Sequence, residues 1–84
     1  MDFLELRREL LSRFDGVAQV YAIPPDRIEL DVSTNLEKEE RIKLIEGLGF
    51  TDNSDMIPDS YKCGNITVVF FSGSLGTFRS KTNF

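Results

Sequence analysis

The sequence predicts a small α+β domain, built as a two-layer sandwich of helices on one sheet. Two stretches carry apolar residues at helical spacing, one at the N-terminus and one after residue 35. Between them, residues 28–33 alternate between apolar and polar, which is typical of a strand with one buried face. A chain of 84 residues builds one small core, so we expect residues 1–84 to form a single domain.

The first helix is predicted to begin after Asp2. Asp2 and Glu5 have the spacing of a capping box, in which each side chain accepts a hydrogen bond from the backbone of the other residue. Apolar residues then recur at steps of three and four, and they are Phe3, Leu6, Leu10 and Phe14. We expect this stripe to pack on the sheet and the helix to end at Asp15 and Gly16.

A β-hairpin is predicted next. Residues 17–23 are rich in β-branched and aromatic side chains, and both faces of this strand are fairly apolar, so we expect it to be deeply covered. Pro24 and Pro25 end the strand, because proline cannot donate a hydrogen bond to a sheet. The alternating strand of residues 28–33 completes the hairpin.

The second helix is predicted to start at Thr34. Thr34 and Glu37 fit a capping box. The apolar face that follows comprises Leu36, Ile42, Ile45 and Leu48. Gly47 or Gly49 should end the helix, since glycine adopts the left-handed conformation of a helix cap without strain.

The rest of the chain is predicted to hold a long loop and one or two strands. Residues 51–65 are rich in Asp, Ser, Asn, Pro and Gly, so we expect a loop that is either functional or mobile. Residues 66–71 are predicted to be an interior strand covered on both faces, and residues 77–84 a weak final strand or a loose tail. The expected core is Phe3, Leu6, Leu10, Phe14, Val20, Ile28, Leu30, Val32, Ile42, Ile45, Val68 and Phe70.

The resulting order is helix, strand, strand, helix, strand, with residues 77–84 as the candidate last strand. This order occurs within the ferredoxin-like plait, whose full order is strand, helix, strand, strand, helix, strand. Residues 3–50 also resemble a heavy-metal-associated domain: a helix, Asp15-Gly16-Val17, a hairpin, a second helix, and Ile45-Glu46-Gly47-Leu48-Gly49-Phe50 at its end. That family's cysteine pair and first strand do not precede the helix, so the resemblance implies no metal site. Residues 77–84 could supply the strand and make the fold a circularly permuted plait.

Composition argues against several classes of function. The net charge is −4, from 14 acidic and 10 basic residues, which disfavours nucleic-acid binding because phosphate backbones require clustered Lys and Arg. Histidine, the commonest general base and transition-metal ligand, is absent. We therefore expect no enzyme, no cofactor and no metal. No run approaches the ~20 apolar residues of a membrane span, and we expect no signal peptide. Cys63 is the single cysteine, which favours a reducing cytoplasm.

Two smaller motifs have simpler explanations than a ligand site. Asp52, Asp55 and Asp59 crowd the long loop, but they lack the spacing and the glycine of a calcium-binding loop, so solvated acids are the better interpretation. Residues 72–77 could cradle a phosphate, but no helix is predicted after them, and a hairpin turn fits better.

The candidate site is a surface for a partner protein. Acidic residues gather in the second half of the hairpin, the second helix and the loop, and they form either a solvated face or a surface for a basic partner. We expect a partner or a homodimer to use a sheet edge at residues 77–84. The predicted partner-binding residues are Glu29, Asp31, Glu39, Glu40, Phe78, Arg79, Lys81 and Phe84. The sequence favours a non-enzymatic protein-interaction or regulatory module. The alternative is a small-molecule or ion sensor that uses residues 51–65, and an enzyme comes third.

Overall fold

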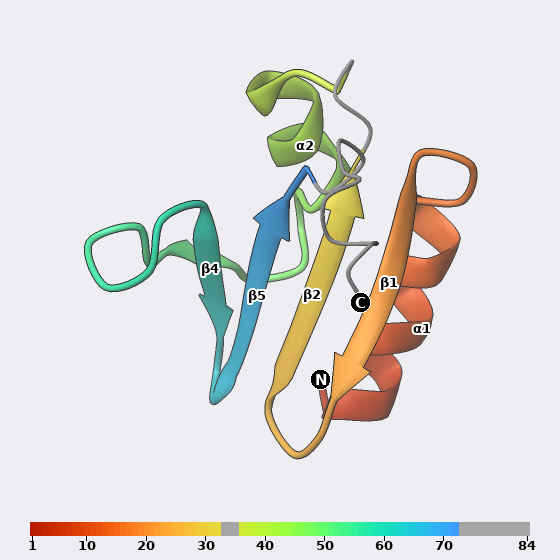
Figure 1. The fold of residues 1–84 in the computed structure, drawn as a ribbon. Helices are drawn as coiled ribbons and strands as arrows, with labels where there is room; N and C mark the ends of the chain where they lie inside the picture. The colour runs from red at the N-terminus through yellow and green to blue at the C-terminus, as the bar shows by residue number, and fades with distance from the viewer. Residues whose placement is uncertain (33–35, 73–84) are drawn as a thin grey trace, which may run out of the picture.

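The computed structural model describes residues 1–32 and 36–72, and within them the chain forms two helices and a five-stranded mixed sheet (Figure 1). The predicted α+β class is therefore confirmed. The elements, in chain order, are α1 (Phe3–Arg13), β1 (Ala18–Ile23), β2 (Arg27–Val32), α2 (Lys38–Leu44), β3 (Thr51–Asp52), β4 (Ser60–Cys63) and β5 (Ile66–Phe71). The strand or tail predicted at residues 77–84 lies outside the described residues.

The strand order of the sheet is β1-β2-β5-β4-β3. The central neighbours β2 and β5 are parallel, whereas the other neighbouring pairs are antiparallel. The β1–β2 pair is the predicted hairpin, and its register places Leu30 between Val20 on β1 and Phe70 on β5. β5 is interior, as predicted, but its side chains alternate between buried and half-buried, so only one face is fully covered.

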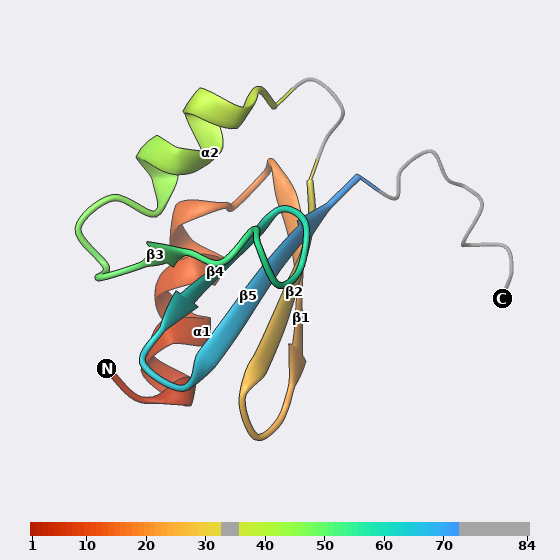
Figure 2. The same ribbon diagram turned by 90° about the vertical axis from the view of Figure 1, so that its left-hand side faces the viewer.

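Both helices lie on one side of the sheet, and the core fills the space between the helices and the sheet (Figure 2). The predicted core residues that are buried are Leu6, Leu10, Phe14, Ile28, Leu30, Val32, Ile45, Val68 and Phe70. Phe3 and Val20 are half-buried and pack against this cluster. Helical spacing and strand alternation located these residues because each element has one face to bury.

The prediction that Ile42 is buried is wrong. Ile42 is exposed, and no residue of α2 is buried. Arg41 lies over the core instead, with its guanidinium carbon 5.4 Å from the centre of the Phe70 ring and its Nη1 3.8 Å from Asp59 Oδ2. Because a guanidinium is attracted to the face of an aromatic ring, α2 can turn a cation rather than an isoleucine toward the core.

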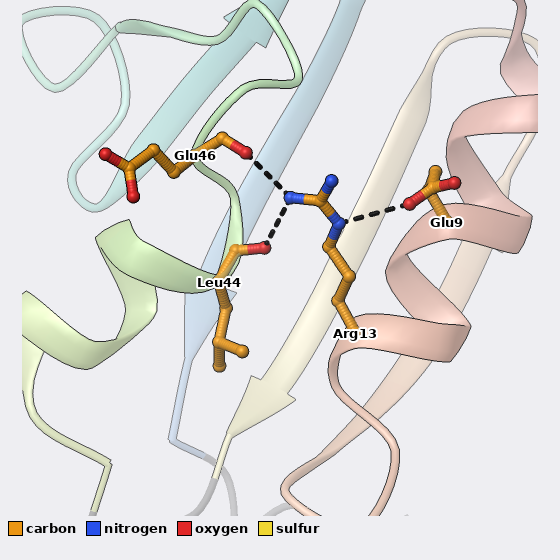
Figure 3. Close-up of polar contacts among 4 residues, drawn as sticks. All are labelled: Glu9, Arg13, Leu44 and Glu46. Carbon is orange, nitrogen blue, oxygen red and sulfur yellow. Dashed lines mark hydrogen bonds and ion pairs between the residues drawn. The ribbon is translucent and has the colours of Figure 1, made fainter.

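The N-terminus of α1 is formed as predicted. Asp2 Oδ1 accepts a hydrogen bond from Glu5 N–H, and Glu5 Oε1 accepts one from Asp2 N–H, both at 2.9 Å. At its other end, Arg13 Nη1 donates to the carbonyls of Leu44 (3.2 Å) and Glu46 (2.7 Å), which joins the C-terminus of α1 to that of α2 (Figure 3). The carbonyl of Leu44, the last residue of α2, thereby gains a charged donor.

The bounds of α2 differ from the prediction at both ends. The helix begins at Lys38 with Glu37 as its N-cap, and the Glu40 carboxylate accepts a hydrogen bond from Glu37 N–H at 3.0 Å. The capping box predicted at Thr34 lies outside the described residues. The helix ends at Leu44, before the predicted glycines, because the following N–H groups bond three residues back and tighten the chain into turns.

Two further predictions are corrected by the sheet. The strand predicted to be deeply covered, β1, has no buried residue, because it is an edge strand and its outward side chains are exposed. Residues 51–65 are not one loop: they contain β3 and β4. The buried Ser60 hydroxyl anchors the turn between them, since it accepts a hydrogen bond from Asn53 Nδ2 (3.0 Å) and donates one to the Ile57 carbonyl (2.7 Å).

Candidate functional site

The two edges of the sheet differ in length and charge. At one edge, β3 has only two residues, and one of them is Asp52. At the other edge, β1 has six residues, Ala18-Gln19-Val20-Tyr21-Ala22-Ile23, and none of them carries a charge. Proteins protect sheet edges with short strands, charges, proline or bulges, because unpaired backbone groups otherwise pair with other chains. Among the described residues, the β3 edge has such protection and the β1 edge does not.

The hydrogen-bond pattern between β2 and its neighbours shows which backbone groups of β1 are not bonded to β2. Thr67 N–H donates to the Asp26 carbonyl at 2.8 Å, which fixes the phase of the parallel β2–β5 pairing. In this phase alternate residues of β2, starting at Ile28, bond to β5, and the residues between them bond to β1. Because Tyr21 pairs with Glu29, Tyr21 and its alternate neighbours bond to β2. The backbone groups of Val20 and Ala22 therefore point out of the sheet.

Ala18, the first residue of β1, has fewer unbonded outward backbone groups than Val20 and Ala22. The Ala18 N–H donates to the Phe14 carbonyl at 3.1 Å, so only the Ala18 carbonyl is left on the outer side. Val20 and Ala22 each present both an N–H and a carbonyl within the described part of the chain. A strand added here would thus form its complete hydrogen-bonded pairs with these two residues.

Exposed apolar side chains gather on both sides of this edge. On the open face of the sheet, Tyr21 is 47% and Ile23 42% exposed. On α1, Leu4 is 64% and Leu11 41% exposed. These are four of the seven large apolar side chains that are exposed within residues 1–32 and 36–72. Such a concentration is typical of a contact surface, whereas scattered exposed apolar residues need no explanation.

The position of the two leucines follows from the geometry of α1. At 3.6 residues per turn, Leu4 and Leu11 lie on the flank of α1 opposite Glu9 and Arg13. Arg13 bonds to Glu9 (3.1 Å) and reaches toward α2, so the opposite flank faces away from α2. Figure 1 shows α1 beside β1 at the outer side of the sheet. We refer to β1 together with Leu4 and Leu11 as the β1 edge.

The acidic residues predicted to bind a partner lie in two separate places. Glu29 and Asp31 are half-buried on β2, with side chains on the face opposite the helices, and Glu29 Oε2 accepts a hydrogen bond from Arg27 Nε at 3.1 Å. Glu39 and Glu40 are exposed in the first turn of α2, on the helical side. The structure does not gather the four carboxylates into one surface. The predicted residues Phe78, Arg79, Lys81 and Phe84 lie outside the described residues.

A second candidate site is a hollow between the end of α2 and the β3–β4 pair. Its volume is about 380 Å³, and its lining includes Ile42, Ile45, Glu46, Phe50, Asp52 and Tyr61. Hydrogen bonds from the Ser54 side chain and backbone N–H lower the pKa of the Asp52 carboxyl below its ordinary value. The hollow thus combines apolar walls with acidic groups.

Within residues 1–32 and 36–72, no three side chains from His, Cys, Asp and Glu lie close enough together to hold a metal ion. The Cys63 thiol donates a hydrogen bond to the Leu48 carbonyl at 3.4 Å. Neither described helix has the length and apolar content to cross a membrane.

The β1 edge was missed by sequence reasoning, which placed the interaction edge at residues 77–84. One signal was available: β1 has no charged residue, whereas β2 carries Arg27, Glu29 and Asp31. Leu4 and Leu11 were also available as apolar positions beside the stripe that packs on the sheet. No known protein family, curated protein or solved structure matches this chain.

Proposed function

We propose that this chain is a non-enzymatic protein-interaction or regulatory module that binds a partner protein along the β1 edge. The observation that carries the proposal is the contrast between the two ends of the sheet within residues 1–32 and 36–72: the β1 end is long and uncharged, whereas the β3 end is short and carries Asp52. A partner segment in extended conformation can add as a further strand there, with main-chain hydrogen bonds for affinity and side-chain contacts for specificity. A cytoplasmic location, favoured by the single cysteine, belongs to the same proposal.

The acidic residues have a steering role in this proposal. Glu29 lies opposite Tyr21 in the β1–β2 register, so its carboxylate, which is paired with Arg27, lies beside the β1 edge. Opposite charges accelerate encounter and suppress wrong partners, and salt screens their effect. If the partner is a basic protein, its binding should weaken as salt rises. Phe78, Arg79, Lys81 and Phe84 stay in the proposed partner-binding set on sequence grounds alone.

We infer that the fold is a circularly permuted ferredoxin-like plait. Moving the first strand of that plait to the end of the chain gives the order helix, strand, strand, helix, strand, strand. The elements α1, β1, β2, α2, β4 and β5 follow this order when the two-residue β3 is set aside. In this interpretation β5, rather than residues 77–84, takes the place of the displaced strand. Its central position, parallel to β2, supports the inference.

The experiment that tests the function compares two matched variants of the full chain. Tyr21→Lys places a cation on the β1 edge, and the new lysine lies opposite Glu29, so the fold should tolerate it. Met56→Lys makes the same charge change at an exposed residue of the turn between β3 and β4. We expect native extract proteins retained by wild type and Met56→Lys, at low salt, to be lost with Tyr21→Lys. Equal retention by all three chains would contradict the proposal.

A small-molecule sensor is the second candidate, and the hollow beside β3 favours it. Its volume of about 380 Å³ lies within the range of ligand pockets, roughly 300–1,000 Å³. A cationic, partly apolar metabolite would match its walls and its acids. Melting curves with a set of such metabolites test this candidate, because a ligand that binds the folded state raises the melting temperature. Asp52→Asn should remove the shift if the hollow is the site, whereas the Tyr21→Lys variant should keep it.

A further inference from the structure

We propose that the partner at the β1 edge is a second copy of this chain, paired with its β1 strand antiparallel to the first. This inference rests on the proposed function, because it uses the same edge. Two copies related by a twofold axis present the same surface to each other, so the surface must be compatible with itself. A strand without charged residues satisfies this condition, since no like charges face each other along it.

The backbone groups of the edge select one register. Val20 and Ala22 offer both an outward N–H and an outward carbonyl, whereas the Ala18 N–H is already bonded to Phe14. In one register, every hydrogen-bonded pair uses an N–H and a carbonyl from both of its residues. This register sets Val20 of each copy opposite Ala22 of the other, which gives two such pairs. Tyr21 then faces its own copy across the twofold axis. This central pair is not hydrogen-bonded, and in such pairs the side chains approach most closely.

The side chains fit this arrangement on both faces. On the open face the two Tyr21 rings meet at the axis, and cross-strand aromatic pairs stabilise antiparallel strands. On the helical face the edge carries Ala18, Val20 and Ala22, whose small side chains leave room for α1 of each copy to approach. The exposed Leu4 and Leu11 lie on the flank of α1 that would face the other copy. The contact therefore covers apolar groups on both faces of the sheet.

Charge distinguishes this contact from the binding of a basic partner. Each copy has a net charge of −4, so two copies repel each other at long range. Arg7 and Arg8 lie between the two leucines along α1 and add like charges near the axis. Salt screens both repulsions. Association of two copies should therefore hold or strengthen as salt rises, whereas the binding of a basic partner should weaken.

The first test is the mass of the full chain in solution, measured by sedimentation over a concentration series. Wild type should form a dimer, and Met56→Lys should form it equally well. Tyr21→Lys places two lysines opposite each other at the axis and should raise the dimer dissociation constant about tenfold or more. A dimer that Tyr21→Lys leaves unchanged would overturn the proposal, because the contact would then lie elsewhere.

Disulfide cross-linking tests the register, in a Cys63→Ser background that removes the native thiol. Facing residues of a non-hydrogen-bonded pair have Cα atoms about 4.5 Å apart, which is within disulfide reach. Tyr21→Cys should therefore form a disulfide-linked dimer under mild oxidation. Gln19→Cys, on the same face of the same strand, should not link to itself, because two such residues lie about 13 Å apart along the strands. Cross-linking of Gln19→Cys in preference to Tyr21→Cys would overturn the register.

The outcomes separate this inference from the proposed function. A wild-type chain that stays a monomer, while Tyr21→Lys still abolishes capture of another protein, overturns the second copy as partner and leaves the function in place. If the wild-type chain is a monomer, and wild type and Tyr21→Lys capture the same proteins equally well, both the second copy as partner and the proposed function are overturned.

Discussion

Leu30→Ala is the most direct test of the core on which the β1 edge is built. Leu30 is fully buried at the centre of the sheet, between Val20 on β1 and Phe70 on β5. The substitution removes three carbon atoms, and at ~0.8 kcal/mol per buried methylene the transfer cost alone is about 2.4 kcal/mol. The unfilled cavity adds to this cost, so the free energy of unfolding should fall by about 2–5 kcal/mol.

The loss is large compared with the stability that a chain of this size has. At roughly 0.05–0.15 kcal/mol per residue, 84 residues have about 4–13 kcal/mol. Urea denaturation followed by circular dichroism should show a lower midpoint at an unchanged slope. Leu4→Ala is the matched control, because Leu4 is mostly exposed and the same change should stay within about 0.5 kcal/mol. Equal midpoints for Leu30→Ala and wild type would refute the assignment of the buried face of β2.

Three further predictions concern individual contacts. Arg13→Met removes the donor that joins the ends of α1 and α2, and the free energy of unfolding should fall by about 1–3 kcal/mol in urea titrations. Ser60→Ala leaves the Asn53 amide without its buried partner and should cost a similar ~1–3 kcal/mol. The pKa of Asp52 in the folded state lies below its ordinary value of 3.8, so ionisation of this carboxyl stabilises the fold. The stabilisation is complete above pH 3.8, and it disappears as the pH falls through the folded-state pKa. Carboxyl NMR titration should find that lowered pKa, and Ser54→Ala should raise it toward 3.8.

The elements in which apolar residues recur at regular spacing could be predicted from the sequence, because each has one face to bury. Leu6 and Leu10 repeat at helical spacing, Ile28 and Leu30 at strand spacing, and all four are buried. The short β3 and β4 strands could not be found this way. β3 pairs with β4, and β4 pairs with β5, so neighbouring strands hold them in place, while their local composition is typical of turns.

The candidate site was harder to predict than the fold for the same reason. Which strand lies at the edge depends on the order of strands in the sheet, and the sequence pattern of β1 does not contain that order. Two fairly apolar faces suggested deep burial, yet Tyr21 and Ile23 are exposed because β1 has a neighbour on one side only among the described residues. Arg41 over Phe70 is a second case, in which tertiary contact overrode the apolar pattern that favoured Ile42.

Amide hydrogen exchange along β1 tests the central claim, that this edge is the interaction surface, most directly. In dilute monomer the N–H groups of Val20 and Ala22 point to solvent and should exchange fast, while the Tyr21 N–H, directed to β2, should exchange slowly. When the chain is concentrated or bound to a partner, exchange at Val20 and Ala22 should slow to the rate of Tyr21. The account is contradicted if association occurs and these two amides still exchange as fast as in the dilute monomer.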